Sequence, residues 1–283
     1  MQGFPAPVPF VGSVLHASDF SPASERAFAH ALAVALLRKT ELTILNAHED
    51  DGVDWRQFPA VRDTLQRWGL LEVGSPRSAV WEQLAVRVSK VSVRGRDPAD
   101  ALVGFVRDHP ADLLVLATEG REGLPRWLHP SVAADVFRRT RTATLFVPEA
   151  ARGFVSLEDG STRLRRIVVP VDERPDPAPA VVYATRAAEA LGDLPVAVTL
   201  LHVGPNGGMP AMDLPEDPAW TFQREERSGD PAEVILGTAR SADADLLVLA
   251  TEGRQGIFDA LRGSVTERVL RSSPCPLLAV PAA

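Results

Sequence analysis

One stretch of eleven residues occurs twice in this chain without a single change. Residues 111-ADLLVLATEGR-121 recur as residues 244–254, at an offset of 133. The same offset aligns three shorter matches: 97-DPAD-100 with 230-DPAE-233, Ser131-Val132 with Ser264-Val265, and Val147-Pro148 with Val280-Pro281. A repeat of this kind predicts two copies of one structural unit.

The front halves of the two copies also match, less closely. Residues 14-VLHASDF-20 align with 167-IVVPVDE-173, and 42-LTILNA-47 aligns with 198-VTLLHV-203. We call residues 1–150 module 1 and residues 164–283 module 2. Residues 149–165 mix charge with Gly and Ser without a sustained period, which predicts a hinge between the modules.

Short apolar runs alternate with helical patterns in each module. In module 1, Ser21-Pro22 and Asp97-Pro98 each place a capping side chain before a proline, which predicts two helix starts. The run DLLVLA has the length and continuous apolarity of a buried strand. Strand, helix and strand in this order predict parallel pairing through right-handed crossovers. The predicted fold class is α/β, with two tandem Rossmann-like modules, each with a mostly parallel five-stranded sheet flanked by helices.

The two modules differ between their second and third strands. Module 1 has helical patterns over residues 55–70 and 76–88. All five tryptophans of the chain, including Trp55, Trp68 and Trp81, are predicted core anchors. Module 2 has the Gly/Pro-rich stretch 204–219 in place of these helical patterns. Two interpretations of that stretch stay open, a disordered connector or a lid over a site.

Composition restricts the partners and the compartment. The chain has 30 Lys and Arg against 37 Asp and Glu, a formal charge of −7, which argues against a nucleic acid or an anionic membrane as partner. No apolar run reaches the roughly 18 residues of a bilayer span. The start carries no basic residue before its apolar stretch, and the single cysteine, Cys275, fits a reducing compartment. We therefore expect a cytoplasmic protein in which Cys275 acts as a small core residue.

The sequence offers no pattern typical of a catalytic or metal site. Its six histidines show neither H-x-H nor H-E-x-x-H spacing, and no Cys/His cluster exists. No nucleophile and base can be paired by spacing. We expect no metal ligands and no catalytic residues, so the chain is predicted not to be an enzyme.

A candidate site lies in module 2. Ligands of open parallel sheets bind beyond the carboxyl ends of the strands, where this sequence places Asp172, Val203 and Ala250. Farther along, Gly253 is followed after nine residues by Gly263-Ser264 and a helical pattern. Glycines before a helix N-terminus present free N–H groups and the positive end of a helix dipole, which suits an anion. Ser264 followed by Glu267 is a capping box that predicts the helix start.

These motifs resemble the universal stress protein family, whose nucleotide-binding members carry G-x2-G-x9-G-[ST]. The resemblance covers most of the chain as a tandem pair and is most specific in 263-GSVTERVLRSSPCPLLAVP-281. It implies a fold like that of the adenine nucleotide alpha hydrolases. It also implies that Asp172 lies near adenine, that Val203 lines the base pocket, and that a third set holds ribose and phosphates: Gly253, Gly263, Ser264, Val265 and Thr266. The implied ligand is ATP or another adenine nucleotide in module 2, accompanied by Mg²⁺.

The resemblance also implies how the protein works and assembles. It implies a cytoplasmic stress-response binding or sensor module. Residues 143–147 are expected to pair with 276–280 inside the chain, which would hide two apolar strand edges. A further homodimer is compatible with that arrangement.

The candidate loop departs from the family pattern. Ala250 stands where the first glycine belongs, and Glu252 places a carboxylate that opposes a triphosphate unless Arg254 or a cation offsets it. In module 1, Pro130 replaces the later glycine and removes an N–H donor, so we expect no nucleotide there. Three interpretations stay open: a nucleotide-binding module, a slow ATP hydrolase or adenylyl-transfer enzyme, and an interaction protein whose glycines only make tight turns.

Overall fold

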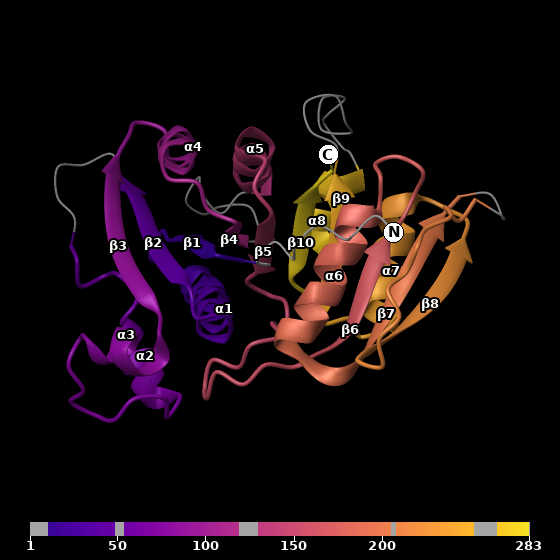
Figure 1. The fold of residues 1–283 in the computed structure, drawn as a ribbon. Helices are drawn as coiled ribbons and strands as arrows, with labels where there is room; N and C mark the ends of the chain where they lie inside the picture. Colours follow the sequence, from indigo (N-terminus) through magenta and orange to yellow (C-terminus); the bar gives the residue numbers. More distant parts are fainter. Residues whose placement is uncertain (1–10, 49–53, 119–129, 205–207, 252–264, 283) are drawn as a thin grey trace, which may run out of the picture.

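The computed structural model describes residues 11–48, 54–118, 130–204, 208–251 and 265–282. They build one ten-stranded sheet with the strand order β3-β2-β1-β4-β5-β10-β9-β6-β7-β8 (Figure 1). Module 1 supplies β1 (Ser13–Ala17), β2 (Glu41–His48), β3 (Arg87–Arg94), β4 (Leu113–Thr118) and β5 (Thr144–Pro148). Module 2 supplies β6 (Leu164–Pro170), β7 (Gly192–Val203), β8 (Trp220–Arg227), β9 (Leu246–Thr251) and β10 (Leu277–Pro281). The predicted α/β class with five strands in each copy is confirmed.

The two halves of the sheet meet at β5 and β10. All strand neighbours within a module are parallel, whereas β5 and β10 run antiparallel. Leu278 lies opposite Leu145, and Leu277 lies opposite Phe146. Figure 1 shows this pair at the centre, with the colours of module 1 on one side and those of module 2 on the other. The pair turns two sheets into one, and neither strand is left with an open edge.

The helices begin where the capping residues predict. Ser21 Oγ accepts a hydrogen bond from Ser24 N at 3.2 Å, and the Asp97 and Asp230 carboxylates accept from N–H groups of the first turns that follow them. Each of these caps is followed by a proline, as expected for a pre-organised first turn. The helices are α1 (Pro22–Arg38), α2 (Val61–Arg67), α3 (Ala79–Leu84), α4 (Pro98–Asp108), α5 (Pro130–Thr140), α6 (Ala178–Leu191), α7 (Pro231–Ser241) and α8 (Val265–Ser272).

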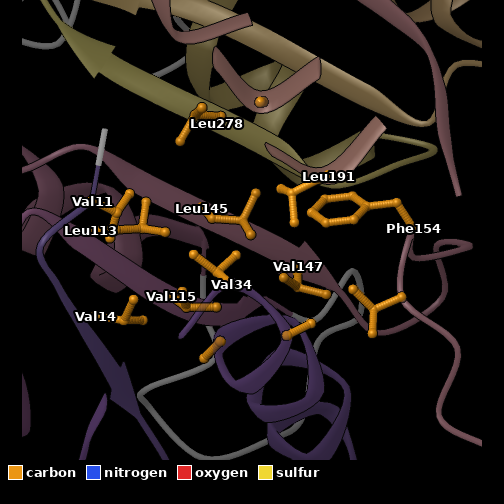
Figure 2. Close-up of a cluster of buried hydrophobic side chains, with 14 of the residues drawn as sticks. Val11, Val14, Val34, Leu113, Val115, Leu145, Val147, Phe154, Leu191 and Leu278 are labelled. Carbon is orange, nitrogen blue, oxygen red and sulfur yellow. The ribbon is translucent and has the colours of Figure 1, made fainter. Parts of the chain in front are cut away.

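The sheet carries a core on each face, and both cores run through both modules. Side chains of α1 and α6 belong to one core, and side chains of α4, α5, α7 and α8 belong to the other. Figure 2 shows part of the first core, where Val115 and Leu145 of module 1 lie near Leu191 and Leu278 of module 2. The two copies therefore share their buried apolar surface instead of each enclosing its own.

The insertion between β2 and β3 differs from the prediction. Helix α2 covers only part of residues 55–70, and α3 ends before β3 begins at Arg87, so the predicted helices were too long. Gly69 and Gly74 take left-handed φ values of 70° and 87°, which ends the helical path after α2.

The prediction that all five tryptophans are core anchors was right for Trp68 and Trp220, which are buried, while Trp127 lies outside the described residues. Trp68 is buried, and its indole N–H donates to the Leu157 carbonyl at 3.2 Å. Trp55 is 56% exposed and Trp81 is 50% exposed, so for these two the prediction was wrong. Both lie on a segment that projects from the sheet, where helical spacing does not imply a core on the other side.

The segment predicted as a hinge is fastened to both modules. Phe154 is buried, and its N–H donates to Nε2 of His30 in α1 at 3.2 Å. Arg152 donates to Asp245 at the start of β9 at 2.5 Å. An added Cβ at Gly153 would lie 2.4 Å from the His30 ring, so a glycine is needed for this close approach.

Two buried histidines predict a specific loss of stability in mild acid. Burial lowers the pKa of His16 and of His30 from 6.5 to about 4. The unfolded chain therefore binds protons first as the pH falls below 6.5, so stability is complete above that value and is lost toward pH 4. We expect the free energy of unfolding to fall by about 2 kcal/mol per histidine between pH 7 and pH 5, a range above the ordinary pKa of carboxylates.

Urea unfolding at both pH values checks this expectation. His30→Leu removes one of the two titrating groups and should cut the pH-dependent loss by about half, even though the variant is less stable at pH 7. An unchanged pH dependence in His30→Leu would show that the loss has another source.

Candidate functional site

The candidate site lies at the carboxyl edge of the module 2 sheet. Strand β6 pairs with β7 on one side and with β9 on the other, so the crossover connections leave in opposite directions there. Such a point of reversal opens a crevice in which ligands of doubly wound sheets bind. In module 1 the corresponding point is β1, between β2 and β4.

The aspartates at these two points have different surroundings. Asp19 Oδ1 accepts hydrogen bonds from Ser21 N at 3.0 Å and Ser24 Oγ at 2.6 Å. Its Oδ2 is buried and has no hydrogen-bond partner among the described residues. Asp172 is exposed, and the described hydrogen bond to its carboxylate comes from the adjacent N–H of Glu173 at 2.7 Å. The module 1 aspartate thus braces the start of α1, whereas the module 2 aspartate faces solvent.

Val203 ends the neighbouring strand. It is half-buried against the α7–α8 side of the sheet and lies opposite Arg227 of β8. This position can present an apolar surface to a flat ligand at the crevice.

His202, one residue earlier, is structural. It is buried, and its Nδ1 bonds to the Val171 carbonyl at 3.2 Å. Asn46 makes the equivalent bond in module 1, from Nδ2 to the Ser18 carbonyl at 2.8 Å. Both side chains therefore tie the end of the second strand to the residue after the first, which supports the interpretation of His202 as a packing residue.

The third part of the site begins at β9. Ala250 is half-buried, and Thr251, the last residue of the strand, is buried with its Oγ1 at 3.4 Å from the Val280 carbonyl. The predicted phosphate-binding residues Gly253, Gly263 and Ser264 lie outside the described residues. The structure thus brings Asp172, Val203 and Ala250 to adjacent strand ends.

Helix α8, which follows residues 252–264, is fixed by an ion pair. Its first residues, Val265 and Thr266, are half-buried. Arg268 makes a two-pronged ion pair with Asp230, the N-cap of α7, at 2.8 and 2.9 Å. Glu267 accepts a hydrogen bond from Arg271 at 3.0 Å, while its predicted capping partner lies outside the described residues. The Arg268–Asp230 pair holds the start of α8 against α7.

The repeated aspartate of ADLLVLATEGR is a structural residue that the sequence analysis did not interpret. In module 1, Asp112 accepts from Gly12 N at 2.8 Å and Ser13 Oγ at 3.2 Å. In module 2, Asp245 accepts from Arg165 N and Arg166 N at 2.8 and 3.0 Å. In each copy, this carboxylate ties the start of the fourth strand to the start of the first. The sequence signal for this role was that an aspartate directly precedes the same buried strand in both copies.

The stretch 204–219 is packed where it is described. Met209, Met212 and Leu214 lie against the core on the α6 side, and the Trp220 indole N–H donates to the Pro215 carbonyl at 3.2 Å. A disordered connector is therefore the wrong interpretation for residues 208–219. The apolar side chains within the Gly/Pro-rich sequence were the signal for this packing.

Three features of the described part of the chain bear on other functions: the cysteine, the possible metal ligands and the helix lengths. Cys275 is buried, and burial raises the pKa of its thiol to about 12, as befits a core residue. No group of three or more His, Cys, Asp or Glu side chains suited to a metal ion occurs among the described residues. None of the described helices combines the length and the apolarity needed to cross a bilayer.

Comparison with known proteins agrees with this geometry. The sequence pattern of the universal stress protein family matches residues 11–148 and 221–281. A universal stress protein of Methanocaldococcus jannaschii is 27% identical over 146 residues, which make up 44% of this chain and 86% of the relative.

Several solved structures resemble this chain over nearly its whole length. A universal stress protein from Archaeoglobus fulgidus has a TM-score of 0.64 at 16% identity, covering 97% of both chains. A Pseudomonas aeruginosa protein has a TM-score of 0.61 at 17% identity, covering 96% of this chain and 93% of the other. These likenesses show a shared fold over both modules.

Proposed function

The chain belongs to the universal stress protein family, and from this premise we propose that it is a stress-response binding or sensor module and not an enzyme. The proposed ligand is ATP or another adenine nucleotide, held in module 2 at the ends of β6, β7 and β9. The proposed compartment is the cytoplasm, in keeping with the single buried cysteine.

The observation that carries this proposal is the contrast between Asp172 and Asp19. A carboxylate that receives a ligand must be open to solvent. Asp172 is exposed and accepts a hydrogen bond from the adjacent N–H of Glu173, whereas Asp19 is half-buried and is engaged by Ser21 and Ser24. This contrast favours module 2 as the binding module and module 1 as its scaffold.

The described residues fit the base side of such a ligand. Val203 offers an apolar surface, and Asp172 can accept a hydrogen bond from an amino group or a hydroxyl. The phosphates would extend toward α8 and the glycines before it. Because Glu252 lies in that loop, we propose that Arg254 or an accompanying Mg²⁺ balances the negative charge.

Calorimetric titration of the full chain with ATP tests the site. Asp172→Asn should weaken ATP binding at least tenfold, about the effect of one lost charge-assisted hydrogen bond. Glu173→Gln is the matched control, because the neighbouring acid loses the same charge outside the strand end, and its affinity should stay near that of the wild type. Equal affinities in all three proteins would contradict the proposed position of the ligand.

Two further measurements separate the alternatives. A binding module should leave ATP intact over hours, so steady turnover by the purified chain would support an ATP hydrolase instead. Mass spectrometry of the denatured, freshly purified protein should detect an adenine nucleotide. A protein that neither retains nor binds one would be an interaction protein.

We also propose that the β5–β10 pair makes the chain a built-in dimer of its two modules. The antiparallel pair and the shared cores support this arrangement. A further homodimer would then have to use another surface.

A further inference from the structure

Module 1 contains a second concave surface, far along the chain from the nucleotide site proposed above. It is a partly open groove of about 980 Å³ lined by the segment before α2, by α2 and α3, and by β3. We call it the α2–α3 groove. In module 2 the described residues 208–219 form an irregular stretch where module 1 has α2 and α3, so the helices that line the groove are a feature of module 1.

Large aromatic side chains are exposed in the groove. Trp55 is stacked on Phe58, with ring centroids 5.1 Å apart and an angle of 18° between the planes. Phe58 is itself buried and meets Phe20 edge to face at 5.0 Å. The Trp55 ring is therefore held from one side by a fixed partner while more than half of its surface is open. A supported and exposed indole is a suitable surface for a planar group.

A second indole, that of Trp81 in α3, also lines the groove. Trp81 is half exposed, and the Arg87 guanidinium carbon lies 4.5 Å from its ring centroid. This cation–π contact orders both side chains in the groove wall.

Positive charge predominates in the groove despite the acidity of the whole chain. Its charged lining residues are four arginines, one lysine and one aspartate: Arg56, Arg62, Arg77, Arg87, Lys90 and Asp63. Arg56 is paired with Asp54, and Arg87 lies 3.7 Å from Glu41. Two of the arginines, Arg56 and Arg87, thus have carboxylate partners. The other three cations share one carboxylate of the groove lining, that of Asp63.

The three remaining cations lack matching carboxylates. Arg62 donates to the neutral Ser75 carbonyl at 3.1 Å, and neither Arg77 nor Lys90 has an ion-pair partner among the described residues. Burial, and then repulsion by Arg77 and Arg62, lower the pKa of Lys90, while Asp63 acts in the opposite direction. A bound anion would relieve this repulsion.

We propose that the α2–α3 groove binds a small phosphorylated ligand with a planar ring. Arg62, Arg77 and Lys90 would contact the phosphate, since guanidinium and ammonium groups recognise phosphate through charge-assisted hydrogen bonds. Trp55 and Trp81 would contact the ring. The volume is that of a small-molecule site, and the net charge of −7 disfavours a long nucleic acid.

The test uses 1-naphthyl phosphate as the probe and isothermal titration calorimetry of the full chain as the readout. The probe should bind at least tenfold more tightly than 1-naphthol or inorganic phosphate, because each of these lacks one half of the recognised chemistry. The double variant Arg77→Gln/Lys90→Gln should weaken probe binding at least tenfold, and Trp55→Leu should also weaken it. Arg96→Gln, which removes an exposed arginine outside the groove lining, is the control and should bind as the wild type does.

Three results would overturn the proposal. The first is equal probe binding by the wild type and the double variant, and the second is no probe binding by either. The third is a groove-dependent affinity for single-stranded oligothymidylate without affinity for the probe, which would identify a nucleic-acid site.

This inference stands apart from the proposed nucleotide site. Asp172→Asn should leave probe binding unchanged. ATP itself has a planar ring and phosphates, so the double variant should keep the part of ATP binding that Asp172→Asn weakens. If the double variant loses ATP binding and Asp172→Asn does not, the nucleotide binds in the groove and the module 2 site is refuted. Each proposal can therefore fail without the other.

Discussion

Replacing Leu278 with alanine is expected to lower the free energy of unfolding by about 3 kcal/mol, within the range for a buried leucine. Leu278 is the second residue of β10 and is buried opposite Leu145, in the middle of the β5–β10 pairing where the two modules join. Its side chain belongs to the core on the α1–α6 side, which is continuous across the boundary (Figure 2). The loss of the side chain leaves a cavity between modules that are already fixed by strand pairing, so the surroundings have little freedom to close it.

Urea or thermal unfolding measures this effect, and Leu37→Ala is its matched control. Leu37 lies near the end of α1 and is 48% exposed, so the same substitution removes little buried surface there. We expect its effect to be within about 0.5 kcal/mol. Similar effects of the two substitutions would mean that the module boundary is not a shared core.

Replacing Asp245 with asparagine is expected to lower the free energy of unfolding by about 2–3 kcal/mol. The Asp245 carboxylate is 1% exposed and accepts from two backbone N–H groups and from Arg152 at 2.5 Å. An amide keeps one acceptor oxygen and turns a donor group toward the other partners. This one substitution therefore weakens two attachments to the start of β9: that of Arg152 in the segment 149–165 and that of the start of β6.

Asp112→Asn provides an internal control for this second effect. Asp112 is the same residue of the repeat and makes the equivalent hydrogen bonds to the start of β1, but it is exposed and has no described arginine partner. We expect the cost to be below about 1 kcal/mol, because water can replace the lost interactions. If the two asparagine variants are equally destabilised, then burial and Arg152 contribute nothing at Asp245.

Much of the fold could be predicted from local sequence. The apolar runs of DLLVLA type form β4 and β9, and Ser21, Asp97 and Asp230 cap the helices that follow them. These features depend on neighbouring residues alone, so the amino-acid pattern is sufficient to identify them. The insertion in module 1 was harder to predict, because Trp55 and Trp81 have the spacing of helical core residues but project into a groove.

The candidate site could be predicted in part. The order of strand and helix patterns places Asp172, Val203 and Ala250 at strand ends, and the structure confirms those positions. The sequence does not show that Asp19, its counterpart, is engaged by Ser24, because that bond depends on how α1 docks beside β1. Nor does it show that Arg62, Arg77 and Lys90 converge, since they lie on separate elements.

The duplication was visible in the sequence alone, because eleven identical residues at a fixed offset require no knowledge of contacts. The repeat determined that the chain has two copies of one α/β unit with parallel strands. Tertiary structure decided what makes the copies unequal: which aspartate stays open to solvent, which carboxylate is buried, and where cations gather. Local patterns fix the elements, whereas burial and charge proximity arise when distant segments pack together. Two copies that share an identical segment can therefore acquire different surroundings.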